Sequence, residues 1–216
     1  MAFTERRWKP RRPLTIDQLK GRANYLTYGR IALVPIIIFC MYGIDDFDPK
    51  RLSFNEFLSW VSMILFAVAM ISDMVDGYYA RKYGVVSSFG KFIDPLADKL
   101  LSMSVSIMLV ALHRLPAWIV ILLIARDVTV TSLRSISASE GMVLAASDWG
   151  KKKTLAQSFG LCFLLVHYPL AHFNVEKIGI ILLWLTVLIS IGSGAHYVVT
   201  FFREVLEKSQ ADTKSV

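Results

Sequence analysis

The chain has 216 residues, of which 55% are hydrophobic and 19% are charged, and its mean hydropathy is +0.50. Soluble globular proteins average about 45–50% apolar and about 25% charged residues, so this composition favours a membrane protein and excludes an intrinsically disordered chain. The formal net charge of +7 is compatible with three kinds of partner, namely nucleic acid, an anionic membrane surface and an anionic substrate.

Six helices are predicted in chain order, each around an apolar run. We expect them near residues 24–43, 54–81, 91–112, 116–139, 152–170 and 175–205. The charge-free runs 154–175 and 178–202 exceed the roughly 18 residues that mark a membrane-spanning helix by length, and the other helices reach that length when a few charged residues at one end are included. The sequence therefore predicts an all-α integral membrane protein with six transmembrane helices.

These helices form one predicted domain, residues 23–207, between two short flanking segments. Residues 1–22 are basic, and we expect them to lie along the inner membrane surface with a short interfacial helix near residues 14–22. Residues 208–216 are predicted to be a C-terminal tail. The connections 45–50, 113–116 and 167–174 are short and are expected to lie together on one side.

The Lys and Arg residues are divided very unevenly between the two sides of the predicted bundle. Twenty of the 24 lie on the side of the two termini, and four lie on the side of the short connections: Lys50, Arg51, Arg114 and Lys177. Because cytoplasmic segments of membrane proteins carry the excess of Lys and Arg, both termini are predicted to be cytoplasmic in a multi-pass protein of the cell membrane. The net charge is then mostly explained by orientation, and nucleic acid is not expected as a partner.

Four aspartates lie at the predicted inner ends of two neighbouring helices. Asp73 and Asp76 are three residues apart at the end of the second helix, and Asp94 and Asp98 are four residues apart at the start of the third, so each pair shares a helix face. Unpaired carboxylates at this depth would repel one another, whereas two bridged Mg²⁺ or Mn²⁺ ions would hold them together and serve phosphoryl chemistry. A structural role, in which the acids end helices and pair with neighbouring cations, explains one such pair better than two.

The four aspartates belong to a longer pattern that also contains two glycines, an alanine and an arginine: Asp73-x2-Asp76-Gly77-x2-Ala80-Arg81-x8-Gly90-x3-Asp94-x3-Asp98. This pattern resembles the signature of the CDP-alcohol phosphotransferases. The resemblance implies that family's fold of six transmembrane helices, usually in a homodimer, and an active site with two metal ions on the cytoplasmic side. It also implies that an alcohol displaces CMP from a CDP-linked donor.

The same resemblance assigns roles to individual residues. Asp73, Asp76, Asp94 and Asp98 are expected to bind the Mg²⁺ or Mn²⁺ ions, and Asp98 is also expected to be the catalytic base that takes the proton of the acceptor hydroxyl. The stretch Asn24-x2-Thr27-x2-Arg30 resembles the family's amino-terminal P-N-x-L-T-x2-R stretch, with Ala23 in place of Pro. The residues expected to bind the CDP moiety are therefore Asn24, Thr27, Arg30, Gly77, Ala80, Arg81 and Gly90.

Two further stretches indicate the acceptor. Residues 126–134 and 150–157 are similar to stretches of family members whose acceptor is glycerol 3-phosphate, except that Asp127 stands where those members have Glu. The cations in these stretches would bind a phosphate that the acceptor itself carries: Arg126, Arg134, Lys151 and Lys153. The resemblance therefore implies transfer of a phosphatidyl group from CDP-diacylglycerol to glycerol 3-phosphate, within the lipid bilayer.

Other interpretations remain open at this point. Phosphatidylglycerol, the acceptor of cardiolipin synthases, or an inositol phosphate would also require cations in the acceptor pocket. An ion or solute transporter also carries acids within the membrane, although the predicted acids gather at one edge of the bilayer and not at its midplane. A structural membrane subunit is the third alternative, and it would bind no CDP.

Overall fold

The structure, a computed structural model, describes the backbone of residues 22–83, 90–139, 148–169 and 173–214 and the side chains of residues 28–74, 93, 96–137, 153–169 and 173–205. Its elements are all helical: α2 (Arg22–Tyr42), the short 3-10 helix η1 (Pro49–Arg51), α3 (Leu52–Tyr83), α4 (Gly90–Ala111), α5 (Ala117–Ser139), α6 (Asp148–Val166) and α7 (Val175–Lys214). The all-α prediction is confirmed for these residues. The predicted interfacial helix and most of the basic segment 1–22 lie outside them.

The helix boundaries follow local signals in the sequence. Pro116 precedes α5, and Pro49 opens η1 behind an Asp48 side chain that accepts a hydrogen bond from the Lys50 amide at 3.0 Å. His113 and His167 have φ angles of 60° and 58°, a left-handed conformation that terminates α4 and α6. The helix predicted near residues 152–170 therefore ends earlier, at Val166, because His167 turns the chain.

The last helix was predicted to end at residue 205, and this was wrong. Helix α7 continues to Lys214, through most of the segment predicted as a tail. The apolar run ends at Phe202, but the residues that follow are good helix formers without glycine or proline, including Glu204, Glu207 and Gln210. The end of the apolar run marked a change of surroundings and not the end of the helix.

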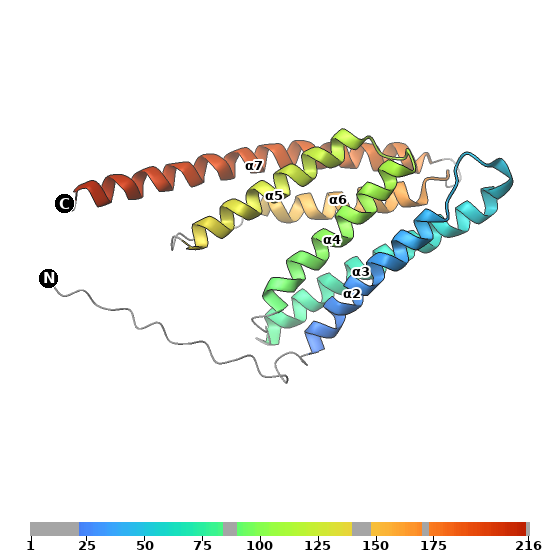
Figure 1. Cartoon of the computed structure of the whole chain (residues 1–216), viewed down its shortest axis with the longest axis horizontal. Helices are drawn as coiled ribbons and strands as arrows, with labels where there is room; N and C mark the ends of the chain where they lie inside the picture. Colours follow the sequence, from blue (N-terminus) through green and yellow to red (C-terminus); the bar gives the residue numbers. More distant parts are fainter. Residues whose placement is uncertain (1–21, 84–89, 140–147, 170–172, 215–216) are drawn as a thin grey trace.

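The six α-helices form two groups that meet at one end. Helices α2, α3 and α4 pack together, α5 and α6 pack against α7, and the two groups approach each other beside the short connections and diverge toward their other ends (Figure 1). Contacts of α3 and α4 with α6, and of α4 with α5, join the groups. The fully buried core side chains come from both groups: Ile37, Met41, Phe66, Leu109, Ile119, Leu161, Leu164 and Leu183.

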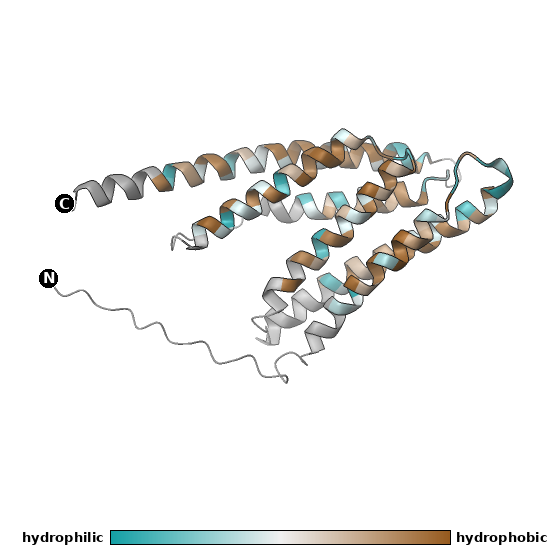
Figure 2. Ribbon diagram, in the orientation of Figure 1, coloured by the Kyte–Doolittle hydropathy of each residue, from teal (hydrophilic) through white to brown (hydrophobic). Residues whose placement is uncertain are grey.

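Hydrophobic residues are frequent over long stretches of the helices (Figure 2). Many large apolar side chains are exposed along these helices. They are exposed on at least four of the helices: Ile36, Phe39, Phe57, Ile64, Ile71, Ile121, Ile181, Leu188, Val199 and Phe202. Water-soluble monomers rarely expose large contiguous apolar patches, so exposed side chains of this kind favour a surface that lipid or other helices cover. Within the described residues, two stretches are long and apolar enough to cross a membrane, Pro49–Met74 and Val175–Val205. Six transmembrane helices stay a prediction.

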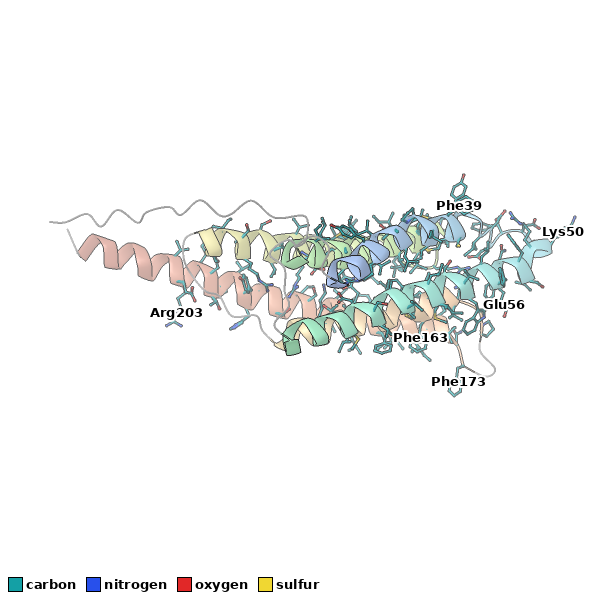
Figure 3. The ribbon with its side chains drawn as sticks, turned by 90° about the horizontal axis from the view of Figure 1, so that it is seen from below. Phe39, Lys50, Glu56, Phe163, Phe173 and Arg203 are labelled. Atoms are coloured by element: carbon teal, nitrogen blue, oxygen red, sulfur yellow. The ribbon has the colours of Figure 1, made fainter. Side chains whose placement is uncertain are left out.

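The predicted gathering of the short connections at one end is confirmed. Lys50 and Phe173, from the first and last connections, lie at the same end of the molecule, and Arg203 lies toward the other (Figure 3). Arg114, from the middle connection, makes a two-pronged ion pair with Asp46 of the first, with Nε–Oδ2 and Nη2–Oδ1 distances of 2.7 and 2.8 Å. Its Nη1 donates to Ser59 Oγ and to the Leu165 carbonyl at 3.0 and 3.1 Å.

Tyr168 completes this Arg114 cluster, which comprises Arg114, Asp46, Ser59, Leu165 and Tyr168. The Tyr168 hydroxyl donates to Asp46 Oδ1 at 3.1 Å, and its ring lies 5.6 Å from the Arg114 guanidinium carbon. The Arg114 side chain is only 1% exposed, so its charge would be costly without an opposite charge and hydrogen-bond acceptors. Asp46, Ser59 and Leu165 supply them. The cluster fixes the ends of α3, α4 and α6 relative to one another.

Three titratable side chains in the short connections have shifted pKa values, namely Asp46, His167 and Tyr168. Burial raises the pKa of Asp46, but the hydrogen bonds and charge of Arg114 outweigh it, so the pKa lies below its ordinary value. Burial and the Arg114 charge lower the pKa of His167, although Glu176 Oε2 lies 3.9 Å from its Nδ1. Burial and the Asp46 carboxylate raise the pKa of Tyr168 to about 12.

The Arg114 cluster predicts a large loss of stability when its cation is removed. Arg114→Ala leaves Asp46 without its buried partner, and we expect the free energy of unfolding to fall by about 3–5 kcal/mol. The measurement is thermal unfolding in detergent. Lys50→Ala, which removes an exposed cation from the neighbouring connection, is expected to change stability by no more than about 0.5 kcal/mol. Equal effects of the two substitutions would contradict this role of Arg114.

The lowered pKa values predict the direction of the pH dependence. Because the unfolded chain binds a proton at His167 more readily than the folded chain, stability falls as the pH drops below about 6.5, and the Asp46 contribution is lost below about pH 4 as its carboxylate protonates. His167→Asn keeps a residue that tolerates a positive φ and removes the titrating ring. We expect the thermal unfolding midpoint of the His167→Asn variant to change less between pH 7 and pH 5 than that of the unaltered protein. If the midpoints of the two proteins change equally with pH, His167 does not contribute to the pH dependence of stability.

Candidate active site

A second group of charged side chains lies on the helices, away from the Arg114 cluster. Arg30 of α2 and Asp73 of α3 form an ion pair of 2.5 Å between Nη1 and Oδ1. Lys153 of α6 donates to both carboxylate oxygens of Asp127 of α5, at 2.6 and 2.7 Å. Asp98 of α4 is partly buried and lies within electrostatic range of all four groups. Five helices thus each contribute one charged side chain to one region, which we call the five-helix cluster.

The first half of this cluster joins two residues that the sequence assigned to different tasks. Arg30, an expected CDP contact, is 3% exposed, and its buried charge is balanced by Asp73, an expected metal ligand. The Asp73 side chain is 40% exposed, so its carboxylate has accessible surface beyond the ion pair. A ligand that approaches Asp73 therefore also approaches Arg30.

The predicted metal ligands are brought together only in part by the described side chains. Asp73 and Asp98 lie within electrostatic range of each other. The backbones of Asp76 and Asp94 lie in α3 and α4, one turn from Asp73 and Asp98 respectively, but their side chains are outside the described set. The described side chains alone contain no group of three potential metal ligands.

The donor chemistry nevertheless fits a hard divalent cation. Asp73 and Asp98 are like charges held within electrostatic range of each other, and the register of α3 and α4 places a further aspartate one turn from each of them. Carboxylate oxygens are the ligands that Mg²⁺ and Mn²⁺ prefer, and a cation would relieve the repulsion among them. The metal site stays a prediction that this arrangement supports.

The remaining expected contacts fall on residues whose backbone is helical but whose side chains are outside the described set. For the CDP moiety these are Asn24 and Thr27 in α2, Gly77, Ala80 and Arg81 in α3, and Gly90 at the start of α4; for the acceptor phosphate it is Lys151 in α6. Their assignments stay predictions.

The expected acceptor cations are arranged around Asp127. Arg126 donates from Nη1 to Asp127 Oδ1 at 3.0 Å, and it donates to α7 through Nε to the Ser190 carbonyl at 3.3 Å and through Nη2 to Ser193 Oγ at 2.9 Å. Because Asp127 also accepts both hydrogen bonds from Lys153, it brings Arg126 and Lys153 side by side.

Arg134, the fourth expected acceptor contact, lies elsewhere on α5. It is exposed, and its guanidinium carbon lies 6.0 Å from the centre of the Tyr197 ring on α7, a cation–π arrangement that orients the side chain. No hydrogen bond described in the structure joins Arg134 to Asp127, which both Arg126 and Lys153 contact. The structure therefore groups Arg126 with Lys153 and places Arg134 about two turns away along the same helix.

Sequence reasoning assigned no binding or catalytic role to several residues that hold this region together. Asp127 was noted only as a departure from Glu, because its contact with Lys153 spans 26 residues and leaves no local pattern. Ser190, Ser193 and Gly194 are spaced so that they share one face of α7, and in the structure this face contacts Arg126. That spacing was the one feature of the sequence that could have indicated a polar contact surface on α7. Lys99 also donates to the Thr131 hydroxyl and joins α4 to α5 beside Asp98.

Comparison with known proteins connects this arrangement to a family. Residues 21–192 match the family model described as CDP-alcohol phosphatidyltransferase. The CDP-diacylglycerol–glycerol-3-phosphate 3-phosphatidyltransferase of Bacillus subtilis (strain 168) is 41% identical over 181 residues, which cover 81% of this chain and 91% of that protein. The Rickettsia typhi protein of the same name is 34% identical, with 83% and 96% covered, and a probable phosphatidylglycerophosphate synthase of Mycobacterium tuberculosis (strain H37Rv) is 34% identical, with 87% and 88% covered.

Two glycines of α7 give a matched test of how closely Arg126 is held. A Cβ atom at Gly194 would lie 3.1 Å from Arg126 Cγ, whereas one at Gly192 would meet nothing within 4 Å. Gly192→Ala is expected to stabilise the protein by up to about 1 kcal/mol through helix propensity, and Gly194→Ala is expected to lose that gain because Arg126 must move. Thermal unfolding of both variants measures the difference, and equal stabilisation would show that Arg126 is not confined by α7.

Proposed function

The chain belongs to the CDP-alcohol phosphatidyltransferase family, and we propose that it transfers the phosphatidyl group of CDP-diacylglycerol to glycerol 3-phosphate, with release of CMP. Relatives that bear the name of this reaction match the chain over most of their own length. The observation that carries the proposal is the five-helix cluster, in which the Asp98 carboxylate lies within electrostatic range of both Asp73 and Lys153. Arg126 adjoins this cluster through Asp127, which also contacts Lys153.

The cation pair accounts for the choice of acceptor. Glycerol 3-phosphate carries a phosphate at one end and the reacting hydroxyl at the other. Arg126 and Lys153 would bind that phosphate through charge-assisted hydrogen bonds, which are stronger than neutral ones. An alcohol that carries a positive charge and no phosphate, such as choline or ethanolamine, would be repelled by these two cations. Arg134 and Lys151 are proposed to approach the same phosphate or to attract the substrate toward it.

Asp98 is proposed to act as the general base. Its carboxylate takes the proton of the acceptor's terminal hydroxyl, and the resulting oxygen forms a bond to the lipid-side phosphorus while the bond from that phosphorus to the oxygen of the departing CMP breaks. Arg30, beside Asp73, and Arg81 are proposed to bind the donor's phosphates and to stabilise the charge that develops on CMP.

A divalent metal centre is proposed for the same place. Asp73, Asp76, Asp94 and Asp98 would hold two Mg²⁺ or Mn²⁺ ions, whose positive charge would neutralise the donor's pyrophosphate. Asn24, Thr27, Gly77, Ala80 and Gly90 are proposed to contact the CDP moiety.

The surroundings of the site suit a lipid substrate. The outward apolar side chains of the helices would lie in the bilayer that also holds the acyl chains of the donor. A multi-pass position in the cell membrane, with both termini and the active site on the cytoplasmic side, is proposed from the distribution of Lys and Arg. A homodimer is proposed from the family resemblance.

An acceptor screen tests this function. Purified protein with CDP-diacylglycerol and Mg²⁺ or Mn²⁺ is expected to release CMP with glycerol 3-phosphate and not with serine, inositol phosphate or phosphatidylglycerol. Asp98→Asn is expected to lower the rate of CMP release by at least about 10²-fold, because the base is lost, while CDP-diacylglycerol still binds. Asp48→Asn, which keeps a good helix cap in a remote connection, is the matched control with unchanged activity.

Each outcome of the screen decides between named alternatives. CMP release with phosphatidylglycerol alone would assign the reaction of a cardiolipin synthase, and release with inositol phosphate alone would assign that acceptor. Ion flux in vesicles without any CMP release would favour a transporter. Normal turnover of Asp98→Asn would remove Asp98 from the role of base.

A further inference from the structure

We propose that Asp127 is the positioning residue of the acceptor's phosphate pocket, where it holds the Lys153 ammonium and the Arg126 guanidinium in the arrangement that receives a phosphate monoester. This inference rests on the proposed function, because it names how the same site binds its acceptor. Neither the family resemblance nor the sequence pattern assigned Asp127 a task.

The contacts show that both oxygens of Asp127 are engaged by cations. Oδ1 accepts from Lys153 Nζ at 2.6 Å and from Arg126 Nη1 at 3.0 Å, and Oδ2 accepts from Lys153 Nζ at 2.7 Å. Lys153 is 3% exposed, so its ammonium depends on this carboxylate for its charge balance. A carboxylate engaged in this way is poorly placed to take a proton from a substrate, which distinguishes Asp127 from Asp98.

The donors that remain indicate what the pair can bind. A lysine ammonium has three N–H donors and an arginine guanidinium has five. Asp127 accepts from two donors of Lys153, and Asp127, Ser190 and Ser193 accept from three of Arg126. Among the described residues, one donor of Lys153 and two of Arg126 are left for a ligand. The oxygens of a phosphate match this set, and the two cations with one anion retain a net positive charge for it.

The position of Asp127 explains why a phosphate-bearing acceptor would be oriented correctly. Asp98 lies within electrostatic range of both Asp127 and Lys153. An acceptor whose phosphate contacts Lys153 and Arg126 would therefore have its other end near Asp98. Without Asp127, the buried Lys153 cation and the partly buried Arg126 cation would repel each other, and the Lys153 side chain would no longer be held beside Arg126.

The test compares two substitutions of Asp127 in the full-length protein. Asp127→Asn keeps the size of the side chain and removes its charge, and we expect the KM for glycerol 3-phosphate to rise about ten- to hundredfold, as for the loss of a hydrogen bond to a charged group. The kcat and the KM for CDP-diacylglycerol are expected to stay within about threefold. Asp127→Glu, which keeps the charge, is expected to restore most of the affinity for the acceptor.

A double substitution separates positioning from direct contact. Lys153→Met weakens acceptor binding by itself, and Asp127→Leu combined with Lys153→Met replaces the buried ion pair by apolar side chains, an exchange that proteins often tolerate. We expect the KM of the double variant to lie within about threefold of that of Lys153→Met, because Asp127 acts largely through Lys153. If the Asp127→Asn variant does not fold, the comparison of the double variant with Lys153→Met still tests the positioning role of Asp127.

The outcomes distinguish the inference from the function on which it rests. Absence of CMP release by the unaltered protein with glycerol 3-phosphate contradicts the proposed function itself. An active unaltered protein together with an unchanged KM in Asp127→Asn, or a loss confined to thermal stability, overturns the positioning role. A KM in the double variant far above that of Lys153→Met overturns the claim that Asp127 positions the acceptor's phosphate largely by holding Lys153, because Asp127 would then act independently of Lys153.

Discussion

The need of every buried charge for a partner organises this helical bundle. A charged side chain taken from water into an apolar interior is costly unless an opposite charge and hydrogen bonds satisfy it. Arg114, Arg30 and Lys153 are all nearly inaccessible to solvent, and each is paired with an aspartate from a different helix or connection. These pairs, together with the apolar core between them, specify which helices lie next to one another.

The two ends of the bundle use this requirement differently. At the end of the short connections, Arg114 meets its carboxylate and its hydrogen-bond acceptors within the chain, and the helix groups approach each other there (Figure 1). In the five-helix cluster, Asp73 keeps accessible surface, and Lys153 and the adjoining Arg126 keep donors beyond those that the described residues accept. A satisfied cluster therefore stabilises the fold, and an incompletely satisfied one is suited to bind a charged substrate.

The sequence predicts much of this organisation where signals are local. Apolar runs and short connections locate all six α-helices, and the spacing of Asp73 and Asp98 within their pairs anticipates that these carboxylates approach each other. Contacts between distant residues leave no such signal. Arg114 counts in the sequence only as one cation on the side of the short connections, because Asp46 is 68 residues away. The role of Asp127 is hidden for the same reason, and the end of α7 was misjudged because hydropathy reports the surroundings of a helix and not its length.

The central claim is that carboxylates and acceptor cations from different helices form one site. The most direct test is the ³¹P NMR line width of glycerol 3-phosphate bound to the full-length protein in the presence of Mn²⁺, which broadens signals of nearby nuclei. Strong broadening in the unaltered protein, lost in Asp73→Asn while glycerol 3-phosphate still binds, is the result that one shared site predicts. Sharp phosphorus signals from a protein that binds both Mn²⁺ and glycerol 3-phosphate would contradict it.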